Sequence, residues 1–162
     1  MDKELAVQSL TDTMAKFTAY IGKRLPKDVK SKLIELKTLE TNPLAKSIYD
    51  SMDENQEAAD RLNRPSCQDT GVIQYFVEAG AHFPLLGELQ EILREATEEA
   101  TRTGPLRHNA VETFDEKNTG TNTGTQIPWL DWRIVPEQDT CTIDVYMAGG
   151  GCTLPGAAKV LM

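Results

Sequence analysis

The stretch that decides the fold is VIQYFV, residues 72–77, a short run of β-branched and aromatic side chains directly after Gly71. Such a run, bounded by a glycine, is typical of a β-strand. Two later segments, IPWLDWRIV (127–135) and CTIDVYM (141–147), alternate with a period of two. Their apolar faces carry Leu130, Trp132 and Ile134 in the first, and Cys141, Ile143, Val145 and Met147 in the second. The sequence therefore predicts three strands.

Four helices are predicted from apolar residues spaced by three and four. The expected faces are Val7, Leu10, Met14, Phe17 and Ile21; Val29, Leu33, Leu36 and Leu39 or Glu40; Leu44, Ile48 and Met52, in a helix ending near Leu62; and Leu86, Leu89, Leu93, Ala96 and Ala100 within 85–102. The last of these helices has a glutamate-rich opposite face, which solvent exposure explains. Because helices come first and strands cluster later, the predicted fold is α+β, with N-terminal helices followed by a mixed sheet.

Length and composition indicate one soluble domain over residues 1–162. The chain is 40% hydrophobic, and its formal net charge of -8 argues against a nucleic-acid partner and against an anionic membrane. The start, MDKELAVQSL, lacks the apolar core of a signal peptide, and no apolar run approaches the ~20 residues of a membrane-spanning helix. An odd set of cysteines, Cys67, Cys141 and Cys152, then favours reduced thiols in the cytoplasm.

The segment RPSCQDTG (64–71) surrounds Cys67 with hydrogen-bonding groups, Gln68, Asp69 and Thr70. An intracellular cysteine is most often a buried small hydrophobe, but these neighbours would all need partners in a core. A nucleophilic thiol would need a histidine partner, and no familiar signature surrounds either histidine of the chain. One thiolate of a metal centre fits better, although the absence of a Cys-x-x-Cys pair disfavours structural zinc. Cys141, in contrast, has the period of a core residue.

Two loops and one arginine are candidates for binding an anion. NTGTNTGTQIP (118–128) and AGGGCTLPG (148–156) offer many unencumbered backbone N–H groups, which bind carboxylates, although a flexible linker has the same composition. Neither is a P-loop or a dinucleotide fingerprint. Arg107 follows Leu106 and precedes His108 and Asn109, and it is either a solvated surface cation or a fixed fork for a carboxylate.

These motifs together resemble a known family. PSCQDTG (65–71), LRHNAVETFDEKNTGTNTGTQIP (106–128) and the triple-glycine loop are similar to the class I, iron–sulfur-dependent fumarate hydratases and L(+)-tartrate dehydratases. The similarity runs from Met1 to Met162 but covers only about the first half of such a subunit. The sequence also ends in an apolar segment, AAKVLM, with no cap or polar tail. The expectation is therefore a C-terminally truncated N-terminal part of the hydro-lyase catalytic (alpha) domain.

The resemblance implies a role for each matching residue. Cys67 becomes one of three thiolate ligands of a [4Fe–4S] cluster, Gln68 and Asp69 line the substrate pocket, Arg107 binds a substrate carboxylate, and Gly151 offers its backbone near the substrate. Asp69 is the catalytic candidate. Fumarate hydratases usually have Ser after the triple glycine, whereas this chain has Cys152, as in the tartrate type. The other two ligand cysteines and the catalytic base lie outside this chain.

The expected function is that of a hydro-lyase alpha subunit that converts L(+)-tartrate into oxaloacetate and water. The implied partners are a beta subunit, in a heterotetramer, and a dicarboxylate substrate. Two alternatives stay open: fumarate and malate as substrates, and a non-catalytic fragment that only binds a partner subunit. The chain alone is expected to be inactive, because one thiolate cannot hold four irons.

Overall fold

The computed structural model describes residues 2–149 apart from 68 and 105. The elements follow the chain as α1 (Lys3–Ile21), α2 (Lys27–Leu39), α3 (Pro43–Leu62), β1 (Val72–Gly80), α4 (Leu89–Thr103), β2 (Trp129–Val135) and β3 (Cys141–Ala148). The predicted α+β class is confirmed. The fourth helix is shorter than predicted, because residues 85–87 form turns before Leu89.

The three strands form one mixed sheet in the order β2-β1-β3. β1 lies in the centre, parallel to β2 and antiparallel to β3. The antiparallel ladder pairs Val72 with Ala148 at one end and Ala79 with Cys141 at the other. The loop before β1 and the loop after β3 therefore leave the sheet at the same end.

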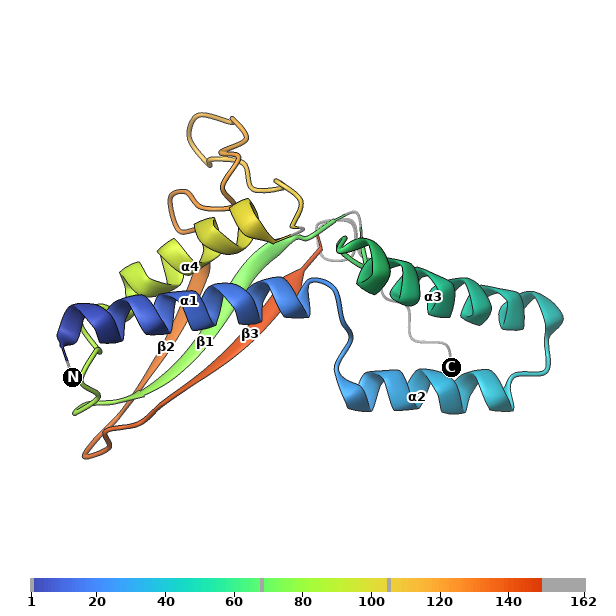
Figure 1. The fold of residues 1–162 in the computed structure, drawn as a ribbon, viewed down its shortest axis with the longest axis horizontal. Helices are drawn as coiled ribbons and strands as arrows, with labels where there is room; N and C mark the ends of the chain where they lie inside the picture. Colours follow the sequence, from blue (N-terminus) through green and yellow to red (C-terminus); the bar gives the residue numbers. More distant parts are fainter. Residues whose placement is uncertain (1, 68, 105, 150–162) are drawn as a thin grey trace, which may run out of the picture.

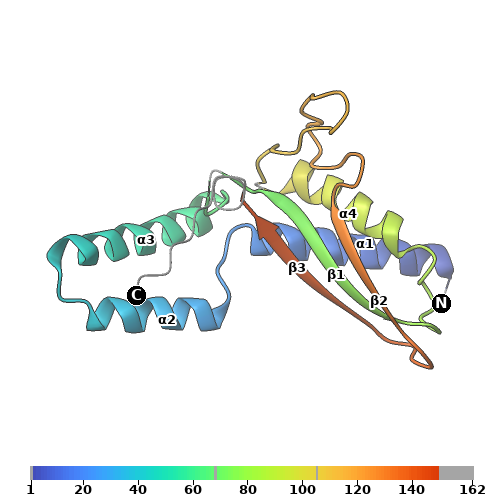
Figure 2. The same ribbon diagram turned by 180° about the vertical axis from the view of Figure 1, so that it is seen from behind.

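Two helices, α1 and α4, cover one face of this sheet (Figure 1), and the view from behind shows the sheet in front of them (Figure 2). The core lies between the two layers and is built from Met14 and Ala15 of α1, alternate residues of β1 from Ile73 to Ala79, and Leu89, Leu93, Ala96 and Ala100 of α4. The predicted faces of α4 and β3 are confirmed, since Cys141, Ile143, Val145 and Met147 all pack against this core.

A buried polar contact ties the layers together. The hydroxyl of Tyr75, which has no exposed surface, lies 3.0 Å from the Thr18 hydroxyl and 2.9 Å from the Thr97 hydroxyl. Thr18 therefore occupies the inner face of α1, and the neighbouring Phe17, predicted to be inside, is 43% exposed. Burial raises the pKa of the Tyr75 hydroxyl, because the phenolate form would be desolvated.

The helices α2 and α3 form a separate hairpin that extends away from the sheet (Figures 1 and 2). The predicted bounds of α3 are confirmed: Asn42 caps its start with a hydrogen bond to the Leu44 N–H, and Asn63 ends it in the left-handed conformation. The predicted apolar stripes are present but lie at the surface, with exposed side chains at Val29, Leu36, Leu39, Leu44, Ile48 and Met52. None of the helices that the structure describes combines the length and hydropathy needed to cross a bilayer.

Candidate active site

The backbone before Cys67 is fixed by two helices. The Ser66 N–H donates to the carbonyl of Gly22, the residue after α1, at 3.1 Å, and the Ser66 carbonyl accepts from Asn55 Nδ2 of α3 at 2.7 Å. Cys67 itself is exposed and lines a cleft of about 760 Å³ between the end of α1 and the α2–α3 hairpin. The thiol is therefore presented to solvent from an anchored backbone.

The next turn brings Asp69 to the end of the sheet. Its Oδ1 accepts from the Gly71 N–H at 2.8 Å, which closes a tight turn into β1. Gly71 has a φ of +74°, and a Cβ placed on it would lie 2.0 Å from the carbonyl oxygen of Ala148. The turn therefore requires glycine, both for its left-handed backbone and for the close approach of β3.

The loop that carries Arg107 joins this turn through backbone and side-chain contacts. The Arg107 N–H donates to Thr70 Oγ1 at 2.8 Å, and Asn109 Nδ2 donates to Asp69 Oδ1 at 2.6 Å. The Arg107 side chain is exposed, so its guanidinium extends from a fixed backbone into solvent. Two motifs separated by almost forty residues in the sequence thus meet in the fold.

A residue not singled out from the sequence holds this loop in place. Asn122 is 2% exposed, and its side chain makes four hydrogen bonds. Oδ1 accepts from the Asn109 N–H at 2.9 Å and from the Ala110 N–H at 3.2 Å. Nδ2 donates to the Arg107 carbonyl at 2.8 Å and to Thr101 Oγ1 at 3.1 Å. The Asn/Thr/Gly segment is therefore an ordered support for the Arg107 loop.

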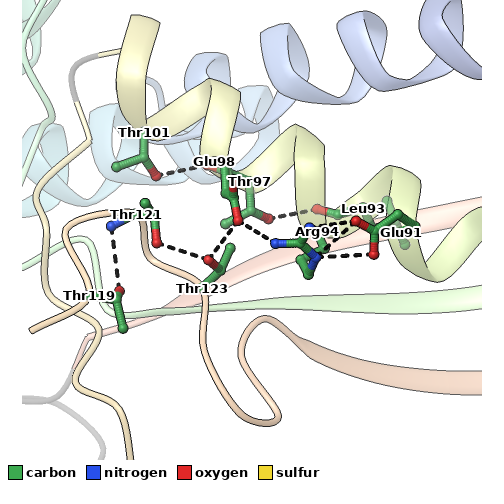
Figure 3. Close-up of polar contacts among 9 residues, drawn as sticks. All are labelled: Glu91, Leu93, Arg94, Thr97, Glu98, Thr101, Thr119, Thr121 and Thr123. Atoms are coloured by element: carbon green, nitrogen blue, oxygen red, sulfur yellow. Dashed lines mark hydrogen bonds and ion pairs between the residues drawn. The ribbon is translucent and has the colours of Figure 1, made fainter. Parts of the chain in front are cut away.

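The acidic face of α4 anchors the same segment (Figure 3). Thr123 Oγ1 donates to Glu98 Oε1 at 3.0 Å, and Glu98 in turn pairs with Arg94 one turn earlier on the helix. The hydroxyls of Thr121 and Thr123 lie 2.9 Å apart. One member of the glutamate run therefore does more than contact solvent: it fixes the loop that holds Arg107.

A second carboxylate, Glu112, closes the far part of this loop. Its Oε2 accepts from the Thr125 N–H at 2.7 Å. Hydrogen bonds from the backbone and then the side chain of Thr125 lower the pKa of Glu112, because they favour the ionised form.

The glycine-rich segment after β3 starts beside Asp69. A Cβ placed on Gly149 would lie 3.4 Å from Asp69 Oδ2, so the backbone here passes close to the carboxylate. Gln68, Gly151 and Cys152, for which roles were predicted, lie outside the described residues. Asp69, the backbone of Arg107 and Gly149 lie together at one end of the sheet.

Cys141 lies at the opposite end of the ladder, paired with Ala79. Partial burial raises the pKa of its thiol, because the thiolate would be desolvated. This placement agrees with the prediction of a packing residue and separates Cys141 from Cys67.

Of the two cysteines in the described part of the chain, Cys67 is the one whose thiol is exposed. Cys67 is accessible and anchored, which suits a ligand. Among the described residues no three His, Cys, Asp or Glu side chains are grouped so as to hold a metal ion. Any cluster at Cys67 therefore needs further thiolates from outside this part of the chain.

Comparison with known proteins places these motifs in a family. The family model for fumarate hydratase (Fumerase) matches residues 11–162. The chain is 58% identical over 161 residues to the L(+)-tartrate dehydratase subunit alpha of Escherichia coli K12, which is 99% of this chain and 53% of that protein. The proteins of the same name from Escherichia coli O157:H7 and Shigella boydii serotype 4 are 59% and 58% identical, with the same coverage. The chain spans about half the length of the curated relatives it matches. It belongs to the fumarate hydratase (Fumerase) family.

Proposed function

We propose that this chain is part of the alpha subunit of a hydro-lyase that dehydrates L(+)-tartrate to oxaloacetate. The observation that carries the proposal is the 58% identity, over 99% of the chain, to a protein named L(+)-tartrate dehydratase subunit alpha. The word subunit in that name supports a partner chain, and we propose a beta subunit in a heterotetramer. The convergence of Asp69, Arg107 and Gly149 at one end of the sheet supports a pocket there.

In this proposal Arg107 binds a substrate carboxylate. A guanidinium presents a planar fork that matches a carboxylate with two parallel hydrogen bonds. The Arg107 carbonyl and N–H are both held by side chains, Asn122 and Thr70, so the fork starts from a fixed point. A short bidentate contact of this kind outweighs the screened field of a chain with net charge -8.

Asp69 is proposed to orient a substrate hydroxyl. One of its oxygens is held by the Gly71 N–H and by Asn109, and the other lies toward Gly149. A carboxylate held in this way accepts a hydroxyl hydrogen in a defined direction. Gln68 and Gly151 are proposed to contribute to the same pocket.

Cys67 is proposed as one thiolate ligand of a [4Fe–4S] cluster, with the other ligands and the catalytic base supplied from outside this chain. Such a cluster, when bound, supplies a Lewis acid that makes hydroxide a better leaving group. The overall reaction breaks one carbon–oxygen bond and removes a proton from the adjacent carbon, giving water and the enol of oxaloacetate. A free thiol ligand requires a reducing compartment, so we propose a cytoplasmic location.

Fumarate and malate are the second candidate substrates, because the matching family model is that of fumarate hydratase. A direct test compares the rates of the anaerobically prepared complex of both subunits on L(+)-tartrate, measured as oxaloacetate, and on malate, measured as fumarate. A higher kcat/KM for tartrate is expected. A higher value for malate would assign the alternative substrate, and a reconstituted complex inactive on both would contradict the hydro-lyase proposal.

The cluster assignment is tested by substituting the two described cysteines separately. In the complex, Cys67→Ser should lose iron, sulfide and the brown absorbance together with activity. The matched control Cys141→Ser should keep them, because that thiol lies at the other end of the sheet. An intact cluster in Cys67→Ser would refute the ligand assignment.

A further inference from the structure

The carboxylate of Asp69 has a fixed orientation. Its Oδ1 accepts two hydrogen bonds, from the Gly71 N–H at 2.8 Å and from Asn109 Nδ2 at 2.6 Å. Its Oδ2 lies 3.4 Å from the position that a Cβ on Gly149 would occupy. Oδ1 is thus held by two donors, and Oδ2 lies beside the start of the glycine-rich segment.

The two donors to Oδ1 differ in kind. The Gly71 N–H belongs to the same turn as Asp69 and moves with it. Asn109 comes from a separate loop, so its amide fixes the carboxylate relative to the rest of the pocket.

Asn109 is itself held before it contacts Asp69. Its backbone N–H donates to Asn122 Oδ1 at 2.9 Å and to the Arg107 carbonyl at 3.0 Å. Asn122 is buried and also binds the Arg107 carbonyl. The residues that place the backbone of Arg107 therefore also place the amide that orients Asp69.

We propose that Asn109 is a positioning residue that sets the distance and angle between the Asp69 carboxylate and the Arg107 fork. The inference rests on the proposed function, in which Asp69 and Arg107 contact the same dicarboxylate. An amide suits this position because it donates to the carboxylate without adding charge, whereas a carboxylate there would repel Asp69. In the proposed enzyme, Asn109 acts through Asp69 and does not touch the substrate.

A double-mutant cycle in the assembled complex tests this coupling. Asn109→Ala should lower kcat by about 100-fold with a smaller change in KM, since a misplacement of about 1 Å in a reacting group costs this much. In an Asp69→Asn background the same substitution should cost less than about threefold, because the carboxylate that it positions is already absent. Equal losses in both backgrounds, or a loss below about threefold in the wild-type background, would overturn the proposal.

A matched control separates positioning from stability. Asn42→Ala removes the side-chain hydrogen bond that caps the start of α3, far from Asp69. The substitution should therefore lower the stability of the fold without changing any contact in the pocket. It should lower the melting temperature and leave kcat within about twofold. A fall in kcat that follows the melting temperature in both variants would show that Asn109 is only structural.

A measurement without turnover distinguishes failure of this inference from failure of the proposed function. In the isolated chain, the side-chain amide resonances of Asn109 should shift in the Asp69→Asn variant, while those of Asn42 stay unchanged. The absence of a shift would overturn the contact and with it the positioning role. A shift together with a complex inactive on tartrate and malate would refute the proposed function, and with it the positioning of a substrate-binding carboxylate.

Discussion

Replacing Asn122 should release the Arg107 loop and lower the free energy of unfolding. The size of the loss follows from the hydrogen bonds that the Asn122 side chain makes. Asn122→Gly removes four hydrogen bonds and leaves the Asn109 and Ala110 N–H groups and the Arg107 carbonyl without this partner. At about 1 kcal/mol for each hydrogen bond, the loss of unfolding free energy is about 4 kcal/mol. This is a large fraction of the roughly 5–15 kcal/mol that stabilises a typical domain.

The backbone adds a second contribution that a pair of variants can isolate. Asn122 has a φ of +58°, which asparagine and glycine tolerate and alanine does not. Asn122→Ala should therefore cost about 1–2 kcal/mol more than Asn122→Gly. Asn63 is the matched control, because it also has a positive φ of 50° but is exposed and accepts one side-chain hydrogen bond, from Lys23. Its alanine and glycine variants should differ by a similar amount, with a much smaller total loss.

Urea unfolding followed by tryptophan fluorescence suits this test. Both tryptophans of the chain, Trp129 and Trp132, lie on β2 directly after the loop. With a slope of about 2 kcal/mol per molar urea, a loss of 4 kcal/mol moves the midpoint by roughly 2 M. A loss below about 1 kcal/mol for Asn122→Gly would refute the conclusion that this side chain holds the loop.

Three further variants test other contacts. Gly71→Ala should prevent the native pairing of β1 with β3, because the added Cβ would lie 2.0 Å from the Ala148 carbonyl; a melting temperature within a few degrees of wild type would contradict this. Tyr75→Phe should abolish an alkaline loss of stability. Because the pKa of Tyr75 is raised in the folded state, its contribution to the free energy of unfolding is fully present below the unfolded-state pKa of about 10 and is lost as the pH rises above that value. Urea unfolding at several pH values would measure this loss. Arg107→Lys in the assembled complex should keep the charge but lose the bidentate contact, so kcat/KM for tartrate should fall by at least tenfold with the cluster absorbance unchanged; near-normal turnover would make Arg107 a surface cation.

Periodicity in the sequence predicted all the helices and strands, but it predicted only some of the buried faces correctly. The apolar faces of α4 and β3 were predicted correctly, and both contribute to the core that alternate residues of β1 share. Phe17 was placed inside wrongly, since Thr18 occupies that position through its contact with Tyr75. Trp132 and Ile134 pair with the buried residues Val77 and Ala79 of β1 and so face the same side of the sheet, yet they are 37% and 50% exposed. How much of a strand the rest of the fold covers depends on tertiary packing, and alternation within one strand carries no information about it.

The candidate site was predicted unevenly for a similar reason. Residues with distinctive chemistry, Cys67, Asp69 and Arg107, were singled out from their motifs. Asn122 was missed, because a loop of asparagine, threonine and glycine has the composition of a linker. Asn109 was missed because its hydrogen bonds join segments far apart in the chain. A signal was available in the pairing of such a loop with a glutamate-rich helix, since Glu98 binds Thr123.

Both ends of the central strand β1 lie very close to the backbone of the segment that contains β3. These close approaches fix the register between β1 and β3. A Cβ on Gly71 would lie 2.0 Å from the Ala148 carbonyl oxygen, and a Cβ on Gly80 would lie 2.1 Å from that of Gln138. A slip of β3 by two residues would keep the same side chains in the core but move Gly149 by about 7 Å relative to Asp69. It would also bring the Ala148 carbonyl against a residue that carries a side chain. The native pairing places glycine under both carbonyls, so the register of the sheet also sets the position of Gly149 beside Asp69.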